Sequence, residues 1–352
     1  MSGDRLLWPR AAAPASPISV RPLDRVAPAS TMGIGELPHL DAGRGVELSM
    51  PGFDIPTVPQ LPAVAGGSML TQAFGDLPGV SIDGARLRVD LARLDVRDPA
   101  AVDVTSPAYA GFAGVLGGSV VRPHGVVKWQ FLGPISGGVA LIEAGVEPID
   151  ALEISHVTIR RKLAGIAAAL DAAAPGTAQI CVLDEPHISA VARRSFPLSI
   201  DEAVDVLSCA MATVQQVASV GVHTCSNLDI GVLLEAGPEL LSVPAHDRLV
   251  RGAGRIDRFL AGGGWVAWGA VPTSAPMGTS ARRASRQLAQ LWGELARHGC
   301  DPDRLRSQSI VTSSCGLARC SEGDADRLCR VVGDVGAILR GEPVRSRATF
   351  GA

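Results

Sequence analysis

Two short apolar segments, far apart in the chain, each end in residues that can bind a metal. The segment Val220–Val222 leads to His223 and Cys225, and residues two apart in an extended chain project to the same side. A second apolar run, residues 309–312, leads to Cys315, a third candidate ligand. A neutral imidazole and two thiolates that face one point suit zinc. The sequence therefore predicts a zinc site at His223, Cys225 and Cys315.

The same residues allow a second interpretation, in which they are a core histidine and two buried free thiols. A lone histidine or cysteine is more often a core residue than a ligand. Their shared placement at strand ends favours the metal site. The other five cysteines are interpreted as structural: Cys181, Cys209, Cys300, Cys320 and Cys329. Among them, Cys320 is an outside candidate for the metal because it is close to Cys315 in sequence.

Composition and charge argue against several classes of protein. The 352 residues carry a net charge of -3 and only 4% aromatic residues, so no nucleic-acid or anionic-membrane partner is expected. The seven scattered cysteines argue against a disulfide framework and for a reducing cytoplasm. No apolar run approaches the roughly 20 residues that cross a membrane. The pattern favours a cytoplasmic protein, and its oligomeric state is left open.

Strand and helix patterns alternate along most of the chain. Eight strand candidates are centred near residues 32, 57, 128, 180, 222, 242, 267 and 311. Helices are predicted over residues 148–173, 199–219, 247–260, 279–298 and 321–339. Alternating βα units imply a parallel sheet, so the prediction is an α/β protein with a (β/α)₈ TIM barrel. A doubly wound open sheet is the alternative, weakened because no G-x-G-x-x-G or Walker sequence follows a strand.

The barrel is expected to occupy residues 31–340 as one catalytic domain. Residues 1–30 are rich in alanine, proline, arginine and serine and are predicted to be a disordered tail. Residues 341–352 are predicted to be a loose C-terminal tail, and residues 40–56 to be irregular. The strand near residue 57 is the weakest prediction, because three prolines fit poorly in a central hydrogen-bonded strand.

A barrel would gather further polar residues around the zinc site. Active sites of such barrels lie at the C-terminal ends of the strands. The polar residues that follow the predicted strands are Glu36, Gln60, Gln130, Asp184, Glu185, His223, Cys225, His246, Asp247 and Cys315. Each one alone could be a cap or a turn residue. Their common location predicts a single site.

Several of these segments resemble the cobalamin-independent methionine synthase family. Thr31–His39 resembles its entry motif, in which Gly-Ser usually stands at Gly35-Glu36. Asp184-Glu185-Pro186 matches the family's Asp-Glu-Pro segment. His223-Thr-Cys225 matches its first zinc pair, and Ser314–Leu317 its distal zinc cysteine.

The likeness extends over about residues 31–340 and includes Trp268–Thr273. It is closest to short, single-barrel members, similar to the C-terminal domain of the longer enzymes, within the uroporphyrinogen decarboxylase and methionine synthase superfamily. The resemblance implies a methyltransferase of methionine biosynthesis with a catalytic Zn²⁺. Zinc would present a thiol substrate as a thiolate, which takes a methyl group from methyltetrahydrofolate or another donor. Homocysteine or a related thiol would be the acceptor.

The resemblance also implies roles for individual residues. Asp184 would hold the amino group of an amino-acid thiol, although it could instead cap the helix after Pro186. Glu185 is interpreted as structural. Asp184 and His246 are the catalytic candidates. The substrate-binding candidates are Glu36, Gln60, Gln130 and Asp184.

Two departures from the family pattern bear on the substrate. The family's fourth zinc ligand, a glutamate, falls near Pro244, which cannot ligate. His246, Asp247, water or substrate could take its place, since three protein ligands suffice for a catalytic zinc. Glu36 stands where the family has a small hydroxyl that helps to bind the substrate carboxylate. A glutamate there would repel a carboxylate, unless it is protonated or turned away, and this disfavours homocysteine itself.

Two alternative functions remain open. The first is a non-catalytic barrel that binds zinc or a thiol. The second is a decarboxylase of the uroporphyrinogen-decarboxylase type. Such a decarboxylase would not need the His-x-Cys pair and the distant cysteine. It should have an arginine-rich pocket for an acidic substrate, and the sequence alone does not reveal one.

Overall fold

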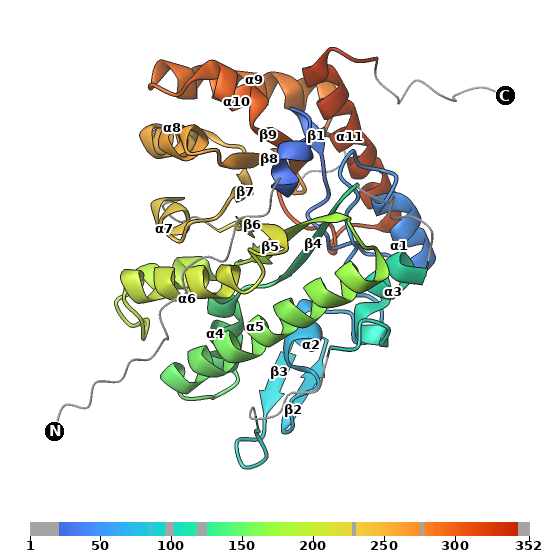
Figure 1. Cartoon of the computed structure of the whole chain (residues 1–352), viewed down its shortest axis with the longest axis vertical. Coiled ribbons are helices and arrows are strands. Elements are labelled where there is room, and N and C mark those ends of the chain that lie inside the picture. The colour runs from blue at the N-terminus through green and yellow to red at the C-terminus, as the bar shows by residue number, and fades with distance from the viewer. Residues whose placement is uncertain are drawn as a thin grey trace.

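The centre of the molecule is a curled sheet of parallel strands (Figure 1). The computed structural model describes residues 21–84, 86–95, 102–117, 125–226, 230–274 and 278–343. Within these ranges the strands of the sheet are β1 (Ser30–Thr31), β4 (Val126–Leu132), β5 (Ala178–Asp184), β6 (Ala218–His223), β7 (Leu240–Pro244), β8 (Trp265–Val271) and β9 (Ser309–Ser313). Their order in this seven-stranded sheet is β1-β9-β8-β7-β6-β5-β4. Each neighbouring pair is parallel, so all seven carboxyl ends lie at the same edge.

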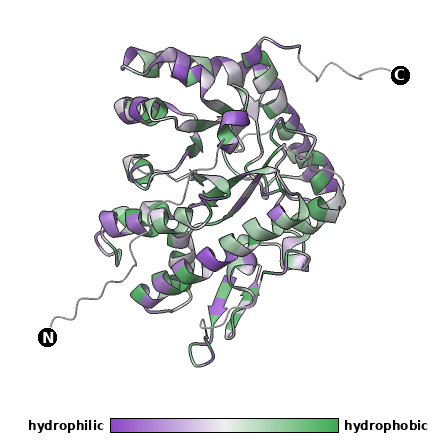
Figure 2. Cartoon of the chain, in the orientation of Figure 1, coloured by the Kyte–Doolittle hydropathy of each residue, from purple (hydrophilic) through white to green (hydrophobic). Residues whose placement is uncertain are grey.

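Helices surround the sheet on its outer side, and most of them contain both apolar and polar residues (Figures 1 and 2). The α-helices are α1 (Ala42–Ser49), α2 (Met69–Phe74), α3 (Ala110–Gly117), α4 (Pro134–Glu143), α5 (Pro148–Ala173), α6 (Ile200–Ala212), α7 (Ile230–Glu235), α8 (Ala253–Ala261), α9 (Ala281–Arg297), α10 (Pro302–Ser307) and α11 (Glu322–Arg340). Short 3-10 helices are η1 (Pro22–Arg25), η2 (Pro107–Tyr109), η3 (Ile188–Ala192) and η4 (Asp247–Gly252). An antiparallel hairpin, β2 (Val80–Asp83) and β3 (Arg86–Val89), projects from one side. No helix in the described ranges has the length and apolarity needed to span a membrane.

Residues 55–60 lie between the two edge strands of the curled sheet. On one side, the Gln60 amide donates to Gly35 O (2.9 Å), and on the other, the Val58 amide donates to Lys128 O (2.8 Å). The strand expected near residue 57 is thus present only as isolated parallel bridges. The prolines of this segment explain the difference, because they lack the N–H that a regular ladder needs. The predicted α/β parallel architecture is confirmed, but the regular sheet is a seven-stranded partial barrel rather than a closed eight-stranded one.

The chain takes part in the fold earlier than the predicted boundary at residue 31. Leu23 in η1 is fully buried, and it packs with Met32, Ile180, Leu240 and other side chains of the sheet interior. Helix η1 contacts β5 and β6, so residues 21–29 belong to the folded domain and not to a tail. Residues 1–20 and 344–352, the rest of the two predicted tails, lie outside the described residues.

Several helices form where none was predicted, among them α1 and α4. Helix α1 lies within residues 40–56, and it begins at Asp41, whose carboxylate accepts from the amides of Gly43 (2.8 Å) and Arg44 (3.4 Å). Helix α4 contains Gly137 and Gly138. Glycine disfavours a helix by about 1 kcal/mol per residue. The glycines in both segments therefore explain why the sequence did not predict these two helices. Helix α6, in contrast, ends at Ala212 rather than near residue 219.

The glycines of α4 allow α5 to approach closely. A Cβ at Gly138 would lie 2.5 Å from Leu152 Cδ2 and 3.2 Å from Leu152 Cα, and the latter belongs to backbone that cannot move freely. We expect Gly138→Ala to lower the free energy of unfolding by about 1–3 kcal/mol, because overpacking outweighs the helix propensity of alanine. Chemical denaturation measures the change.

The matched control is Gly293→Ala in α9, where no atom lies within 4 Å of the added Cβ. That variant should be more stable than the parent by about 0.5–1 kcal/mol. Equal stability of the two variants would contradict the close packing of α4 on α5.

Candidate metal centre

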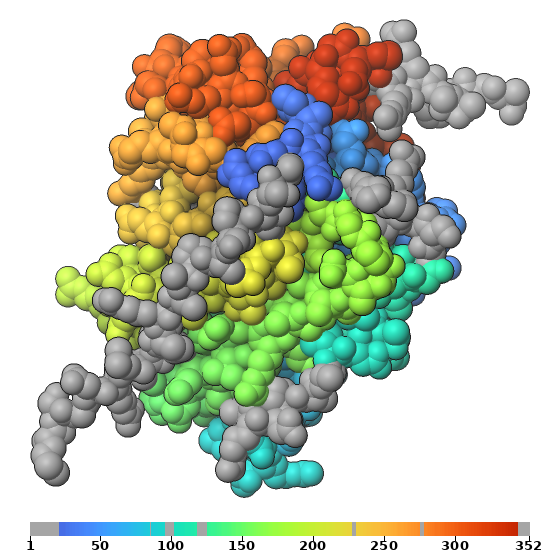
Figure 3. Space-filling model, in the orientation of Figure 1, coloured from blue at the N-terminus to red at the C-terminus, as the bar shows by residue number. Residues whose placement is uncertain are grey.

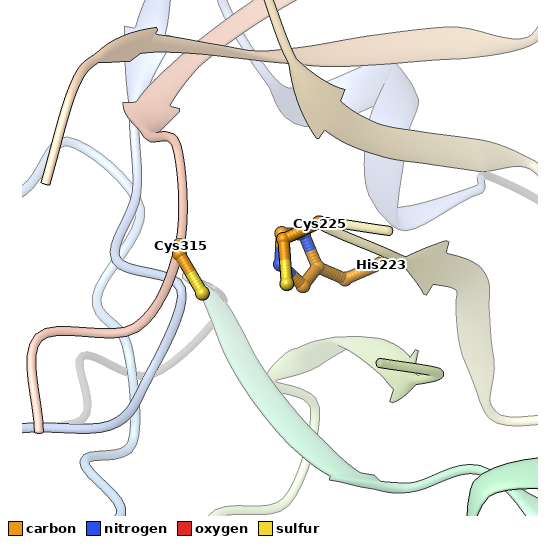
Figure 4. A group of neighbouring side chains, drawn as sticks. All are labelled: His223, Cys225 and Cys315. Carbon is orange, nitrogen blue, oxygen red and sulfur yellow. The ribbon is translucent and has the colours of Figure 1, made fainter. Parts of the chain in front are cut away.

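The fold brings together the three ligands that the sequence predicted. His223 is the last residue of β6, Cys225 lies two residues further, and Cys315 lies two residues beyond β9. One ligand atom from each of the three residues lies within 4.8 Å of the others. Figure 4 shows that the side chains of His223 and Cys225 come from the end of one strand and that Cys315 faces them from another. The grouping depends on the parallel sheet, because the two segments are almost 90 residues apart in the chain.

His223 has the environment of a neutral ligand. It is 2% exposed, and its Nδ1 lies 2.9 Å from the hydroxyl of Ser242 on the neighbouring strand β7. Its Nε2 is buried and has no hydrogen-bond partner among the described residues. Burial, reinforced by the positive charge of Lys128, lowers the pKa of His223 to about 3. With the ring proton donated from Nδ1 to Ser242, the lone pair of Nε2 is left for a metal.

The thiol groups of the two cysteines interact with each other. A hydrogen bond between the sulfur atoms of Cys225 and Cys315 lowers the pKa of Cys225 to about 6. The same bond, together with burial, raises the pKa of Cys315. Cys225 is exposed and Cys315 half-buried, so the pair is accessible from outside. The contact between the thiols therefore favours a thiolate at Cys225 over one at Cys315.

These residues fit zinc by their chemistry. A buried imidazole nitrogen without a partner and two adjacent sulfur atoms are the donors that zinc prefers. The hydrogen bond from His223 to Ser242 supplies the outer contact that orients a ligating histidine. Three protein ligands leave a tetrahedral zinc one position for a substrate, as in catalytic sites.

Two carboxylates border the three ligands. Asp184, the last residue of β5, is paired in register with His223 on β6. Burial, then repulsion from Glu36 and Cys225, raises the pKa of Asp184 well above its usual range. Glu36 lies beside the loop of Cys315, and its backbone carbonyl accepts from the Leu317 amide (2.8 Å). Burial also raises the pKa of Glu36, although the positive charge of Arg319 opposes that effect.

The side chains of Gln60 and Gln130 face each other in the interior. Gln130 Nε2 donates to Gln60 Oε1 (2.5 Å), and Gln60 Nε2 donates to Gln72 Oε1 (3.0 Å). The buried ammonium group of Lys128 donates to Gln130 Oε1 (2.7 Å) and to the carbonyl of Ile34. Because Gln60 and Gln130 are each 1% exposed and already paired, the structure places them beneath the site and not on an open surface.

Glu185 has the structural role that the sequence suggested. Its carboxylate is fully buried and accepts from the amides of Ile135 (2.9 Å) and Ser136 (2.7 Å) in the first turn of α4. Its backbone amide donates to His223 O (2.8 Å), and its carbonyl accepts from the Thr224 hydroxyl (2.9 Å). The helix-capping carboxylate of this segment is therefore Glu185, and Asp184 is left facing the site.

His246 and Asp247 are not part of the three-residue group. His246 is exposed at the start of η4, where its Nδ1 accepts from the Arg248 amide (3.2 Å). Asp247 is exposed in the first turn of the same helix. The group of close ligand atoms among the described residues therefore includes neither His246 nor Asp247.

The structure also contains an arginine-lined cavity that sequence reasoning missed. It has a volume of about 520 Å³ and lies beside the segment of the metal ligands. Its lining residues are Thr224, Ser226, Ile230, Val243, Pro244, His246, Arg248, Leu249, Arg251, Gly252 and Arg255. The spacing of the three arginines was the available signal, but in a sequence that spacing is typical of any solvated helix face.

The fold is similar to that of B12-independent methionine synthases of known structure. One from Shewanella sp. W3-18-1, solved in complex with selenomethionine, has a TM-score of 0.60 and 14% identity, covering 90% of this chain and 98% of that chain. A putative vitamin-B12-independent methionine synthase from Listeria monocytogenes has a TM-score of 0.45 and 12% identity, covering 75% and 77%. No protein-family model and no curated protein sequence matches the chain. The Shewanella structure supports the predicted resemblance at the level of the fold.

Zinc binding should depend on the two cysteines. We expect the wild-type protein, prepared under reducing and zinc-replete conditions, to hold about one zinc per chain and Cys315→Ser to hold almost none, because the substitution removes a thiolate ligand. Metal analysis of the purified proteins measures this. Cys320→Ser is the control and should retain its zinc. Full zinc content in Cys315→Ser would rule out the site.

The hydroxyl of Ser242 should strengthen zinc binding through His223. We expect Ser242→Ala to weaken zinc affinity by about 10- to 100-fold, because His223 then loses the contact that orients its ring. Competition with a chromophoric chelator gives the affinity. Ser307→Ala, an exposed position on α10, should leave it unchanged. Unchanged affinity in Ser242→Ala would mean that the Ser242 hydroxyl does not orient His223 for zinc binding.

Proposed function

We propose that the protein is a zinc-dependent methyl- or alkyltransferase that acts on a small thiol, of the methionine-synthase type. The observation that carries this proposal is the convergence of His223, Cys225 and Cys315, with the buried Nε2 of His223 unpartnered. Zinc held by these residues would lower the pKa of a substrate thiol and favour its thiolate. The shared fold of the Shewanella methionine synthase supports the same class of reaction.

The proposed reaction transfers a methyl group to sulfur. The substrate thiol loses its proton, and its sulfur forms a new bond to the methyl carbon. The bond between that carbon and the donor breaks, and the donor keeps the electron pair and takes up a proton. Methyltetrahydrofolate is the proposed donor and homocysteine or a related thiol the acceptor, with a methylated corrinoid or an epoxide as other electrophiles of suitable chemistry.

Asp184 and Glu36 are proposed to receive a cationic part of the substrate. Burial and then the charge of Glu36 raise the pKa of Asp184, and burial raises the pKa of Glu36 as well. An ammonium group placed between them would relieve this repulsion. The pair therefore favours an amino thiol, whereas a substrate carboxylate must lie away from Glu36.

The other predicted site residues receive less direct roles in this proposal. Gln60 and Gln130 support the floor of the site through their contacts with each other and with Lys128. His246 borders the neighbouring arginine-lined cavity and is proposed to contact substrate rather than zinc. Residues 55–60 are proposed to act as the eighth strand position that completes a TIM-like barrel around the site. The free thiols of the site require a reducing compartment, so we propose a cytoplasmic location.

The test is direct assay of thioether formation. Zinc-loaded protein is incubated with L-homocysteine or its desamino analogue 4-mercaptobutanoate, each with methyltetrahydrofolate, methylcobalamin or a simple epoxide. Mass spectrometry detects the S-alkylated product. We expect product with at least one donor, a preference for the amino thiol, and loss of that preference by about tenfold or more in Asp184→Asn, which removes the charge opposite the ammonium group.

Two variants serve as controls for this assay. Cys315→Ser should form no product, because it lacks the zinc site. Asp150→Asn, a charge-matched substitution on α5, should behave as wild type. A zinc-loaded protein that forms no thioether with any pair would contradict the transferase and favour the non-catalytic binding protein.

A further inference from the structure

The arginine-lined cavity lies against the segment that carries two metal ligands. One wall contains Thr224 and Ser226, so Cys225 lies between two of its lining residues. Another part is formed by Val243 and Pro244, which directly follow Ser242, the hydrogen-bond partner of His223. The remaining lining residues belong mainly to η4 and α8, and Figure 1 shows α8 between α7 and α9. The space-filling view shows the helices of this half packed side by side in chain order (Figure 3).

The charged side chains that the structure describes in the lining of this cavity are all arginines. Arg248, Arg251 and Arg255 are three and four residues apart, and this helical spacing places them on one face. All three are exposed, and no carboxylate is among the lining residues that the structure describes. The chain as a whole has a net charge of -3, so the cavity contrasts with the average surface. Guanidinium groups bind the oxygens of phosphates and carboxylates in a bidentate manner.

Further polar groups border this lining. The Nδ1 of His246 accepts from the Arg248 amide (3.2 Å), so the neutral ring carries its proton on Nε2 and can donate from there. On the other wall the Thr224 hydroxyl donates to the Glu185 carbonyl and lies 2.8 Å from the Ser226 hydroxyl, so this wall is polar but uncharged. Arg255 is positioned by Gly231 in α7, where an added Cβ would lie 2.6 Å from the Arg255 Nη1. The cavity therefore has cationic groups on one wall, hydroxyl groups on the other and room for a substituent of several non-hydrogen atoms.

We propose that this cavity binds the anionic part of a substrate whose reactive group lies at the metal centre. The ligand is a phosphate or a group of neighbouring carboxylates, since both present the oxygens that arginine recognises. The location of the substrate's reactive group rests on the proposed function, whereas the anion site rests on the cavity alone. The site also gives a negative substituent a place away from Glu36, which would repel it.

Binding of two probes to the metal-free protein tests the anion site. Isothermal titration at constant ionic strength is carried out with inorganic pyrophosphate and with a triglutamate peptide, both on Cys315→Ser protein so that zinc cannot bind them. We expect at least one probe to bind and the added pair R248Q/R251Q to weaken it by about tenfold or more. Preference for pyrophosphate would identify a phosphorylated substrate, and preference for triglutamate a polycarboxylate. Both substitutions are at exposed positions, and the unfolding transition of the variant checks that it is folded.

The charge-matched control is R86Q/R88Q on the β3 strand of the hairpin, where both arginines are exposed and outside the cavity lining. It should bind the probes as the parent does. Equal binding by parent, R248Q/R251Q and R86Q/R88Q, or no binding by any, would overturn the anion site. This outcome is independent of methyl transfer, because no turnover is measured. If zinc-loaded wild-type protein forms a thioether, the probe that binds should also inhibit that reaction. A probe that binds without inhibiting would show that the cavity is not part of the substrate site.

Discussion

The buried carboxylate of Glu185 holds three parts of the molecule in one place. Its two oxygens accept the amides of Ile135 and Ser136, which start α4. Its backbone amide and carbonyl join β5 to His223 and Thr224 at the end of β6. Burial raises the pKa of Glu185 to about 7, and the hydrogen bonds from the first turn of α4 oppose that effect. These contacts join the ends of β5 and β6 to the start of α4, next to His223.

The residues of the candidate metal centre differ in their burial and in their tendency to ionise. Burial and Lys128 favour the neutral form of His223, the form in which an imidazole can bind a metal. Cys225, in contrast, is exposed and Cys315 half-buried, and the contact between the two thiols lowers the pKa of Cys225. The candidate site is thus buried at His223 and accessible at Cys225. Such a division suits a metal that must hold its position while a substrate enters and leaves.

The pattern of the sequence was sufficient for elements whose local signals agree with their surroundings. Pro148–Ala173 has helical periodicity with a proline in its first turn, and the helix has these bounds. It was insufficient where tertiary contacts outweigh local preference, as in α4, whose glycines disfavour a helix but allow α5 to approach. It was equally insufficient for Gln60 and Gln130, because a polar residue near a strand end can point to the site or into the interior. The buried amide network decides that these two point inward.

By itself the sequence was enough to predict the alternation of strands and helices, the three residues of the candidate metal centre and the resemblance to cobalamin-independent methionine synthases. Hydrophobic periodicity and residue chemistry are local properties, so a linear chain reveals them. Only the tertiary structure decided that the second strand is reduced to bridges, that His246 lies apart from the ligands, and that three arginines share one cavity with Thr224. Those features depend on which segments lie side by side in the curled sheet. The parallel register that sets these distances arises from contacts between residues far apart in the chain.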